Sequence, residues 1–315
     1  RSVAKAFDAV GIKYDLTEKS KAPSFTTNWL TNNEHPLAKL IREAREINKL
    51  HSTFIDSILR YSHKGRIHAE INLQQIPARN KDYGKLIRGL FLPEENCKWG
   101  SFDYSQQEPR LVVHYAATTD KKLGGLAGAD VLIRAYKEDD ADFHQVVADM
   151  ANIPRTQAKT INLGIFYGMG QAKLAKQLGI TVEEAKAILA EYNNKVPFVK
   201  QLANRVQKQA SETGAVKTIG GRKCRFNLYE PKSYGLFLAL TEKEYIMEHG
   251  SLASGRRAMT YKALNRLIQG SAADQVKQAM VNCYKAGHKV MENSVDLEVP
   301  NKVDVAIGDN WGEAL

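Results

Sequence analysis

The amino-acid sequence predicts an α+β protein in which a long helical middle is flanked by short strands. Helical periodicity runs from about residue 106 to 219 and returns at residues 263–287. Strand-like alternation occurs instead near residues 71, 100 and 304. Because the strand patterns lie on both sides of the helical run, the sequence favours a sheet that is interrupted by a helical insertion.

Charge and composition restrict the possible partners. The 315 residues include 45 Lys and Arg against 35 Asp and Glu, which gives a net charge of +10. This excess favours a polyanion such as nucleic acid, although charge alone leaves a membrane surface open. No apolar run approaches the ~20 residues that cross a bilayer, so we expect no membrane span. The three cysteines fit no metal or disulfide pattern, and the N-terminus lacks the apolar core of a signal peptide; both indicate an intracellular protein.

The first third of the chain alternates between helical and strand patterns. Residues 35–61 carry apolar side chains at helical spacing and predict a long helix. RIHAEINL at 66–73 alternates like a strand, and the following QQIPARN contains a proline that breaks any helix. KWGSFDYS at 98–105 predicts a short buried strand that ends in polar residues.

The remaining elements follow in chain order. Pro154 favours the start of a helix, because proline is well tolerated at the first helical position. TIGGRKCRF at 218–226 predicts a hairpin or a tight loop with cations, and ALNRLIQGSAADQVKQAMVNCYKAG at 263–287 predicts another helix. VDVAIG at 303–308 predicts a closing strand.

One helix in the middle carries an unusual stripe. In RTQAKTINLGIFYGMG, residues 155–170, the stripe residues Arg155, Lys159, Leu163 and Tyr167 follow one another at four-residue intervals. Such steps keep side chains on one side of a helix, and Lys159 to Tyr167 spans roughly 12 Å, about the length of a nucleoside triphosphate. Cations at one end would suit phosphates, and the ring at the other end would suit a base. Spacing alone still favours an ordinary amphipathic helix with solvated cations.

Three other positions could carry chemistry. Asp103 ends a predicted strand and could bind a hard metal ion, although a lone Asp there is more often a turn or cap residue. Glu108 and Arg110 stand where a helix should begin, and their simpler interpretation is a capping carboxylate and a solvated cation. His144, in DADFHQVV, could contact phosphate, although a lone histidine on a helix usually does not.

Taken together, these segments resemble the family A DNA polymerases, the bacterial DNA polymerase I-like group. SFDYSQQEPRLVVHYA resembles the first catalytic motif of the family, and RTQAKTINLGIFYG resembles its nucleotide-binding helix. DFH matches an Asp-any-His signature, while NLQQIPARN and KALNRLIQGSAADQVKQAM resemble the primer-template segments. The resemblance covers roughly residues 30–315, with the motifs in the family's order.

The resemblance implies an α+β right-hand polymerase, with an antiparallel-sheet palm and helical fingers and thumb. The implied thumb is residues 1–66, the palm is 67–115 and 246–315, and the fingers are 116–245. The implied activity is DNA-templated addition of dNMP to a primer 3′-OH by two-metal phosphoryl transfer, with primer-template DNA and dNTPs as partners. No proofreading pattern is visible, and the implied location is the cytoplasm of a bacterium or of a phage-infected host.

The resemblance also assigns roles to single residues. Asp103 would hold two Mg²⁺ ions, assisted by the carbonyl of Tyr104, and Glu108 would block the 2′ position of the sugar. Contacts to the nucleotide are implied for eight residues, of which Lys159 is also catalytic: Tyr104, Gln106, Glu108, His144, Arg155, Lys159, Leu163 and Tyr167. Contacts to the DNA are implied for Gln75, Arg79, Asn265 and Gln269.

The sequence departs from the family's pattern in two ways. Leu163 stands where family members usually carry Phe or Tyr. A leucine at this position is more typical of phage enzymes. The family's His-Asp-Glu triplet, which supplies the second metal carboxylate, is absent. We infer that the printed sequence omits segments near residues 72–73 and 290–291. The alternative is a true deletion, which would leave the metal site one carboxylate short and inactive. We reject four nearby carboxylates as replacements, because their surroundings resemble a structural strand and turn: Asp296, Glu298, Asp304 and Asp309.

Two alternative functions remain open. A single-subunit phage-type RNA polymerase shares the metal aspartate and the lysine-to-tyrosine helix. Glu108 argues against it, because an enzyme that accepts ribose should not carry a bulky side chain there. A catalytically inactive, basic DNA-binding module is the alternative from a different class of function.

Overall fold

The computed structural model describes residues 2–17, 20–67, 83–119, 125–138, 141–166, 169–233, 235, 237–286, 291 and 294–314. Two compact units divide the chain. The first comprises Arg1–Ser101 and Ala306–Leu315, and the second comprises Phe102–Val305. These boundaries differ from the thumb, palm and fingers limits expected from the sequence, which stay a prediction.

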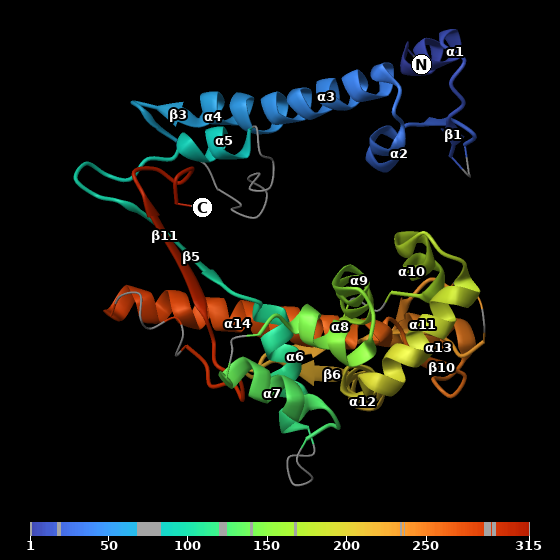
Figure 1. Ribbon diagram of the computed structural model, residues 1–315. Coiled ribbons are helices and arrows are strands. Elements are labelled where there is room, and N and C mark those ends of the chain that lie inside the picture. The colour runs from blue at the N-terminus through green and yellow to red at the C-terminus, as the bar shows by residue number, and fades with distance from the viewer. Residues whose placement is uncertain are drawn as a thin grey trace. The chain divides into compact units, whose positions relative to one another are not determined.

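The first unit is built from short elements around one long helical rod (Figure 1). The rod consists of α3, a π-helical turn η1 and α4, which confirms the helix expected over residues 35–61. The elements of this unit are α1 (Ser2–Ala9), β1 (Asp15–Leu16), β2 (Pro23–Ser24), α2 (Thr27–Asn32), α3 (Pro36–Leu50), η1 (His51–Ile55), α4 (Asp56–Tyr61), β3 (Ser62–His63), β4 (Arg66–Ile67) and α5 (Gly84–Gly89).

Two small aromatic clusters hold this unit together. Phe7 is fully buried and stacks on Phe25, with ring centroids 5.2 Å apart. Near the chain's C-terminal end, Trp311 stacks on Trp99 at 5.6 Å, and the Arg88 guanidinium lies 4.4 Å from the centre of the Trp311 ring.

The second unit is mainly helical and contains the larger core. Its helices are α6 (Gln107–Thr118), α7 (Ala129–Glu138), α8 (Phe143–Ala151), α9 (Arg155–Phe166), α10 (Gln171–Leu178), α11 (Val182–Lys195), α12 (Pro197–Thr213), α13 (Glu242–His249), the 3₁₀ turn η3 (Thr260–Lys262) and α14 (Ala263–Ala286). This confirms the helical middle and the helix expected at 263–287. The 24-residue α14 packs against α6 and α12 (Figure 1).

Local sequence signals set several helix ends. Thr181 and Glu184 form a reciprocal capping box at the start of α11. Asp142 caps α8 by accepting hydrogen bonds from the backbone N–H groups of His144 and Gln145. Pro154 directly precedes α9, so the predicted start of this helix is confirmed.

Strands in the second unit form hairpins and one small sheet. β6 (Ala215–Lys217) and β7 (Lys223–Arg225) pair antiparallel, which confirms the hairpin expected at 218–226. The three-stranded sheet has the order β10-β8-β9 and consists of β8 (Leu228–Pro231), β9 (Leu240–Thr241) and β10 (Gly255–Arg257).

β5 (Trp99–Tyr104) and β11 (Val303–Gly308) form a further two-stranded sheet, and both strands were expected from the sequence. The expectation that the first of them is a buried strand is wrong. Phe102 is 40% exposed, Asp103 is also exposed, and only Tyr104 is buried. In the described part of the chain β5 pairs only with β11, so burial of its side chains depends on what packs against its two faces.

Candidate active site

The turn from β5 into α6 separates the side chains of two neighbouring residues. Successive side chains of a strand point to opposite faces. Tyr104 points inward, where its hydroxyl donates to the Met291 carbonyl at 2.6 Å and lies 2.8 Å from Ser294 Oγ. Asp103 is therefore presented on the other face, where its carboxylate is exposed.

A buried arginine fixes this turn. Arg110 is 1% exposed, so the interpretation as a solvated cation is wrong. Its Nε donates to the Ser105 carbonyl at 2.9 Å, and its Nη1 donates to the Pro300 carbonyl at 2.5 Å. Its guanidinium also lies 4.4 Å from the centre of the Tyr136 ring. A buried charge needs such partners, and here they lock the chain just after Asp103.

Gln106 links the turn to the start of α8. Its backbone is left-handed, with φ 52° and ψ 42°. Its Oε1 accepts from the Phe143 N–H at 2.8 Å and from the Tyr136 hydroxyl at 3.2 Å, while its Nε2 donates to the Ala141 carbonyl at 3.2 Å. The amide is thus engaged within the protein, and contact between Gln106 and a nucleotide stays a prediction.

Glu108 lies in the first turn of α6 and is half-buried. The negative side chain is suited to the positive end of the helix dipole. Asp103 lies at the end of β5 and Glu108 lies at the start of α6, so the turn between the two elements positions both carboxylates.

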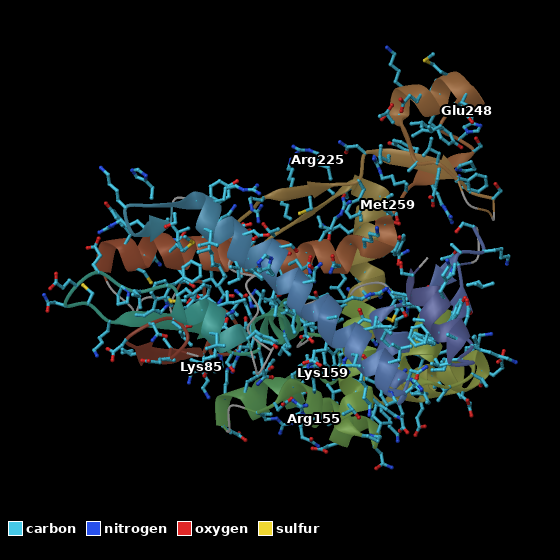
Figure 2. The ribbon with its side chains drawn as sticks, turned by 90° about the horizontal axis from the view of Figure 1, so that it is seen from above. Lys85, Arg155, Lys159, Arg225, Glu248 and Met259 are labelled. Carbon is cyan, nitrogen blue, oxygen red and sulfur yellow. The ribbon has the colours of Figure 1, made fainter. Side chains whose placement is uncertain are left out.

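The described stripe residues of α9 lie as their spacing predicts. Arg155 and Lys159 are both exposed, and Leu163 is half-buried. Figure 2 shows Arg155 and Lys159 close together on this helix. Arg155 forms an ion pair with Asp142, the capping residue of α8. Tyr167, the last residue of the stripe, lies outside the described residues.

The ion pair affects the titration of Asp142. Partial burial would raise the pKa of its carboxyl. Hydrogen bonds from Arg155 and from the backbone N–H groups of Gln145 and His144 outweigh this and hold the pKa below its ordinary value. At neutral pH the carboxylate therefore stays ionised and holds Arg155 at the start of α8.

His144 lies beside the stripe, because α8 packs against α9. Its Nδ1 is 3.2 Å from Nδ2 of Asn162 on α9, and the Tyr192 hydroxyl on α11 donates to Oδ1 of the same Asn162. Burial is the main cause that lowers the pKa of the His144 imidazole, Asp142 opposes the lowering, and Lys159 and Arg155 add to it.

The predicted DNA contacts are only partly described. Asn265 is half-buried and Gln269 is exposed, four residues apart on α14. Residues at this spacing share a helix face, so one ligand could contact both. Gln75 and Arg79 lie outside the described residues, as does the junction near 72–73.

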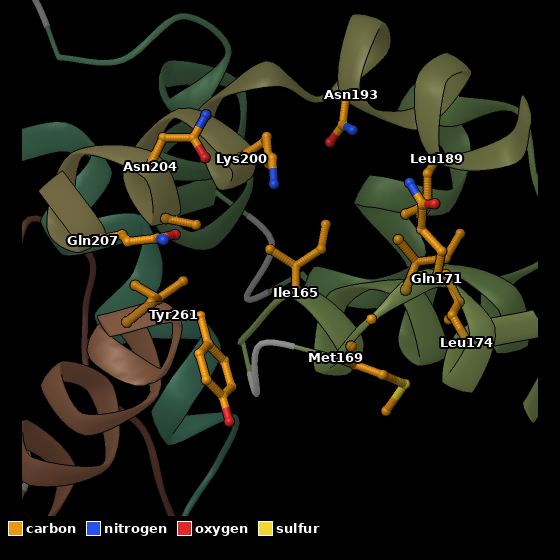
Figure 3. Close-up of a pocket in the computed structure, with 15 residues that line it drawn as sticks. Ile165, Met169, Gln171, Leu174, Leu189, Asn193, Lys200, Asn204, Gln207 and Tyr261 are labelled. Atoms are coloured by element: carbon orange, nitrogen blue, oxygen red, sulfur yellow. The ribbon is translucent and has the colours of Figure 1, made fainter. Parts of the chain in front are cut away.

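A cavity of about 320 Å³ lies on another side of α9. Figure 3 shows Lys200, Asn204 and Gln207 on one side of it and Gln171, Leu174 and Leu189 on the other. None of the three described stripe residues lines this cavity. The described stripe residues therefore lie on a different side of α9 from this cavity.

Two of the described residues offer donors for a two-ion metal centre. The Asp103 carboxylate and the Tyr104 carbonyl are hard oxygen donors of the kind that magnesium prefers. Within the described ranges, however, no group of three or more His, Cys, Asp or Glu side chains could hold a metal ion. The donors fit such a centre in kind but not in number. None of the described helices is long and apolar enough to span a membrane.

Sequence reasoning missed the partners of the candidate residues. It assigned no role to Asn162 or Tyr192, which are 0% and 1% exposed. A polar Asn at a buried helical position was the available signal, because a buried amide needs hydrogen-bond partners. The identity of the partner could not be read from the sequence, since Tyr192 is 30 residues away.

Comparisons with known proteins match almost the whole chain. The family model "DNA polymerase family A" matches residues 7–291. A DNA-directed DNA polymerase of Pseudomonas phage M6 is 32% identical over 99% of this chain and 57% of its own length. The thermostable DNA polymerase I of Thermus aquaticus is 28% identical over 97% of this chain and 40% of its own length.

Among solved structures, the POL domain of Pol1 from M. smegmatis, in complex with DNA primer-template and dNTP, has a TM-score of 0.75 and 26% identity. It matches 98% of this chain and 61% of its own chain. The α+β right-hand polymerase fold expected from the sequence is thereby confirmed.

This chain is shorter than the relatives that it matches. It spans about half the length of the curated relatives it matches. The alignment with the phage M6 enzyme extends over 401 residues, whereas this chain has 315, so the relative has residues at positions where this chain has none. Family polymerases generally use divalent metal ions. The family match and the 32% identity along almost the whole chain show that this chain belongs to DNA polymerase family A.

Proposed function

We propose that this chain is a DNA-templated DNA polymerase that adds dNMP to a primer 3′-OH. In this reaction the primer 3′-hydroxyl loses its proton to solvent and its oxygen forms a bond to the α-phosphorus of the dNTP. The bond between the α-phosphorus and the β-phosphate oxygen breaks, and pyrophosphate leaves. The observation that carries the proposal is the surface of α9, where exposed Arg155 and Lys159 lie beside the half-buried imidazole of His144.

Phosphoryl transfer requires mainly positioning and charge neutralisation from a protein. Lys159 would place a positive charge at the triphosphate, and His144 would donate a hydrogen bond to it. Arg155 would exchange or share its ion pair with Asp142 when phosphate oxygens arrive. Leu163 and Tyr167 would contact the sugar and the nascent base pair.

Two magnesium ions are part of the proposal. Bound beside Asp103, these ions would act as Lewis acids on the reacting oxygens. Asp103 and the Tyr104 carbonyl would hold them on this chain. A second carboxylate would have to come from a segment at the junction near 290–291. The phage M6 alignment is longer than this chain, so the relative has additional residues, although the alignment length does not assign them to this junction. The intact mass of the purified protein distinguishes an omitted segment from a true deletion.

Primer-template DNA would contact the basic protein through Gln75, Arg79, Asn265 and Gln269. In domain terms, residues 1–66 would form the thumb, 67–115 and 246–315 the palm, and 116–245 the fingers. The proposed location is the cytoplasm of a bacterium or of a phage-infected host, as the phage and bacterial origin of the relatives suggests.

Template-directed primer extension separates the proposal from its alternatives. A DNA polymerase extends the primer with dNTPs in preference to NTPs, whereas a single-subunit RNA polymerase prefers NTPs. An inactive DNA-binding module binds the duplex and extends nothing. The half-buried Glu108 favours the DNA polymerase, because it would occupy space beside C2′.

Glu108→Ala is expected to weaken the preference for dNTPs over NTPs, because removal of the carboxylate opens room for a ribose hydroxyl. Overall activity should also fall, since Glu108 stabilises the first turn of α6. Glu108→Gln is the matched control: it keeps the size of the side chain and should keep the preference. Competition between a dNTP and the matching NTP measures it, and an unchanged ratio in Glu108→Ala would refute the gate.

Leu163→Tyr is expected to raise the use of dideoxynucleotides relative to dNTPs by at least about tenfold, or about 1.4 kcal/mol in differential transition-state binding. The tyrosine hydroxyl would take the place of the missing 3′-OH, whereas leucine offers no polar group there.

The measurement for Leu163 is the ratio of incorporation efficiencies for one base in wild type and variant. Leu163→Phe supplies the ring without the hydroxyl and should leave the ratio low. If Leu163→Tyr also leaves it unchanged, Leu163 does not face the sugar, and the stripe is rotated away from the nucleotide.

A further inference from the structure

Three side chains from three helices form a continuous hydrogen-bonded chain behind the nucleotide-facing side of α9. Tyr192 of α11 donates to Asn162 of α9, and Asn162 faces His144 of α8. Both α9 and α11 contact α8, and Figure 1 shows the three helices in the same part of the second unit. The inner two residues are excluded from solvent, whereas His144 is partly exposed. The chain therefore leads from the core to the candidate site.

The hydroxyl proton of Tyr192 determines how the Asn162 amide is oriented. Burial raises the pKa of Tyr192 far above its ordinary value, so the hydroxyl keeps its proton. That proton is donated to Asn162 Oδ1. If the amide rotated to exchange its oxygen and nitrogen, the proton would lose this acceptor at a site 1% exposed, which is costly. The amide NH₂ is therefore kept on the side of His144.

The amide orientation in turn selects the state of the imidazole. An amide NH₂ can only donate, so the His144 Nδ1 that faces it at 3.2 Å must be an unprotonated acceptor. In a neutral imidazole the proton then resides on Nε2. A proton on Nδ1 would place two donors against each other.

We infer that Asn162 and Tyr192 are positioning residues that hold His144 as a neutral imidazole with its proton on Nε2, ready to donate to a phosphate oxygen of the incoming nucleotide. The inference rests on the proposed function of this site. The charged groups around His144 are Asp142 on its own helix and Arg155 and Lys159 on α9. With these two cations beside it, His144 can contribute a directed hydrogen bond without adding a third positive charge.

The tautomer can be measured in the free protein, whether or not the protein is active. The ¹⁵N shifts of the His144 ring, assigned by their loss in His144→Gln, should show an unprotonated Nδ1 and a protonated Nε2 at neutral pH. A protonated Nδ1 in wild type would overturn the inference. In Tyr192→Phe the Asn162 amide loses the hydroxyl that orients it. The ¹⁵N shifts of His144 should then move toward those of a ring protonated on Nδ1.

Steady-state kinetics test whether the pair acts through the imidazole. Loss of the His144 hydrogen bond in His144→Gln should raise the KM for dNTP about tenfold or more with a smaller change in kcat. Tyr192→Phe should raise it roughly three- to tenfold, because the donor is only misoriented.

The double variant decides between positioning and a general structural role. If Tyr192 acts through His144, Tyr192→Phe should raise KM no further in the His144→Gln background. An equal increase in both backgrounds would overturn the inference. Tyr245→Phe is the matched control, because Tyr245 is 0% exposed and its hydroxyl lies 3.3 Å from Ser254 Oγ; it should leave KM unchanged.

Failure of the proposed function has a different signature. Absence of primer extension by wild type, or an unchanged KM in His144→Gln, would refute the triphosphate contact itself. The ring nitrogen shifts would still report whether Asn162 and Tyr192 fix the tautomer.

Discussion

Asp103→Asn is expected to abolish nucleotide incorporation, with a loss on the order of a thousandfold or more, while duplex binding stays nearly unchanged. The amide keeps the size of the carboxylate but removes its charge, which is what a divalent ion requires. Duplex binding would depend instead on many phosphate contacts spread over a chain of net charge +10.

The measurement is single-nucleotide incorporation, with duplex affinity determined on the same sample. Asp130→Asn provides a matched control, because Asp130 pairs with Arg134 on the surface of α7 and should tolerate the change. If Asp103→Asn keeps incorporation within about tenfold of wild type, the assignment of Asp103 as a metal ligand is wrong.

Lys159→Ala is expected to cost on the order of 2–4 kcal/mol in transition-state stabilisation, by analogy with loss of one preorganised electrostatic group. Lys159 is exposed on the same face of α9 as Arg155, so in the proposed site its amine would be available to a triphosphate. Because all four dNTPs carry the same triphosphate, the loss in kcat/KM should be equal for each base.

Lys176→Ala is the control for Lys159, since it removes an exposed lysine from the neighbouring helix α10. It should leave kcat/KM nearly unchanged. A defect of Lys159→Ala that is confined to one base would mean that Lys159 contacts the base, and the orientation proposed for the stripe would be wrong.

Secondary structure was predictable from local pattern. α9 begins directly after Pro154, α11 begins at a capping box, and α14 matches the helix expected at 263–287 almost residue for residue. Periodicity and end signals lie within a few residues of one another, so the sequence displays them directly.

The environment of the candidate residues was not predictable in the same way. Arg110 is buried because the carbonyls of Ser105 and Pro300 accept its protons, and one of these lies 190 residues away. The orientation of His144 likewise depends on Asn162 and Tyr192 from other helices. Such partners come together only through the fold, and no local pattern records them.

The arrangement of the metal donors was predictable only as a resemblance. Asp103 and Tyr104 end a strand as expected, but the described residues add no cluster of carboxylates beside them. Because the His-Asp-Glu triplet is missing, only a measurement of catalytic activity can decide whether the metal site is complete.

Template-directed primer extension in the presence of magnesium is the decisive experiment for the proposed DNA polymerase activity. A labelled primer annealed to a template with a defined next base is mixed with the purified protein and one dNTP at a time. We expect that only the complementary dNTP is added, that the matching NTP is added far less, and that chelation of magnesium stops the reaction. Duplex binding without any extension would refute the proposed activity, provided that the intact mass shows that the protein contains the segment near 290–291.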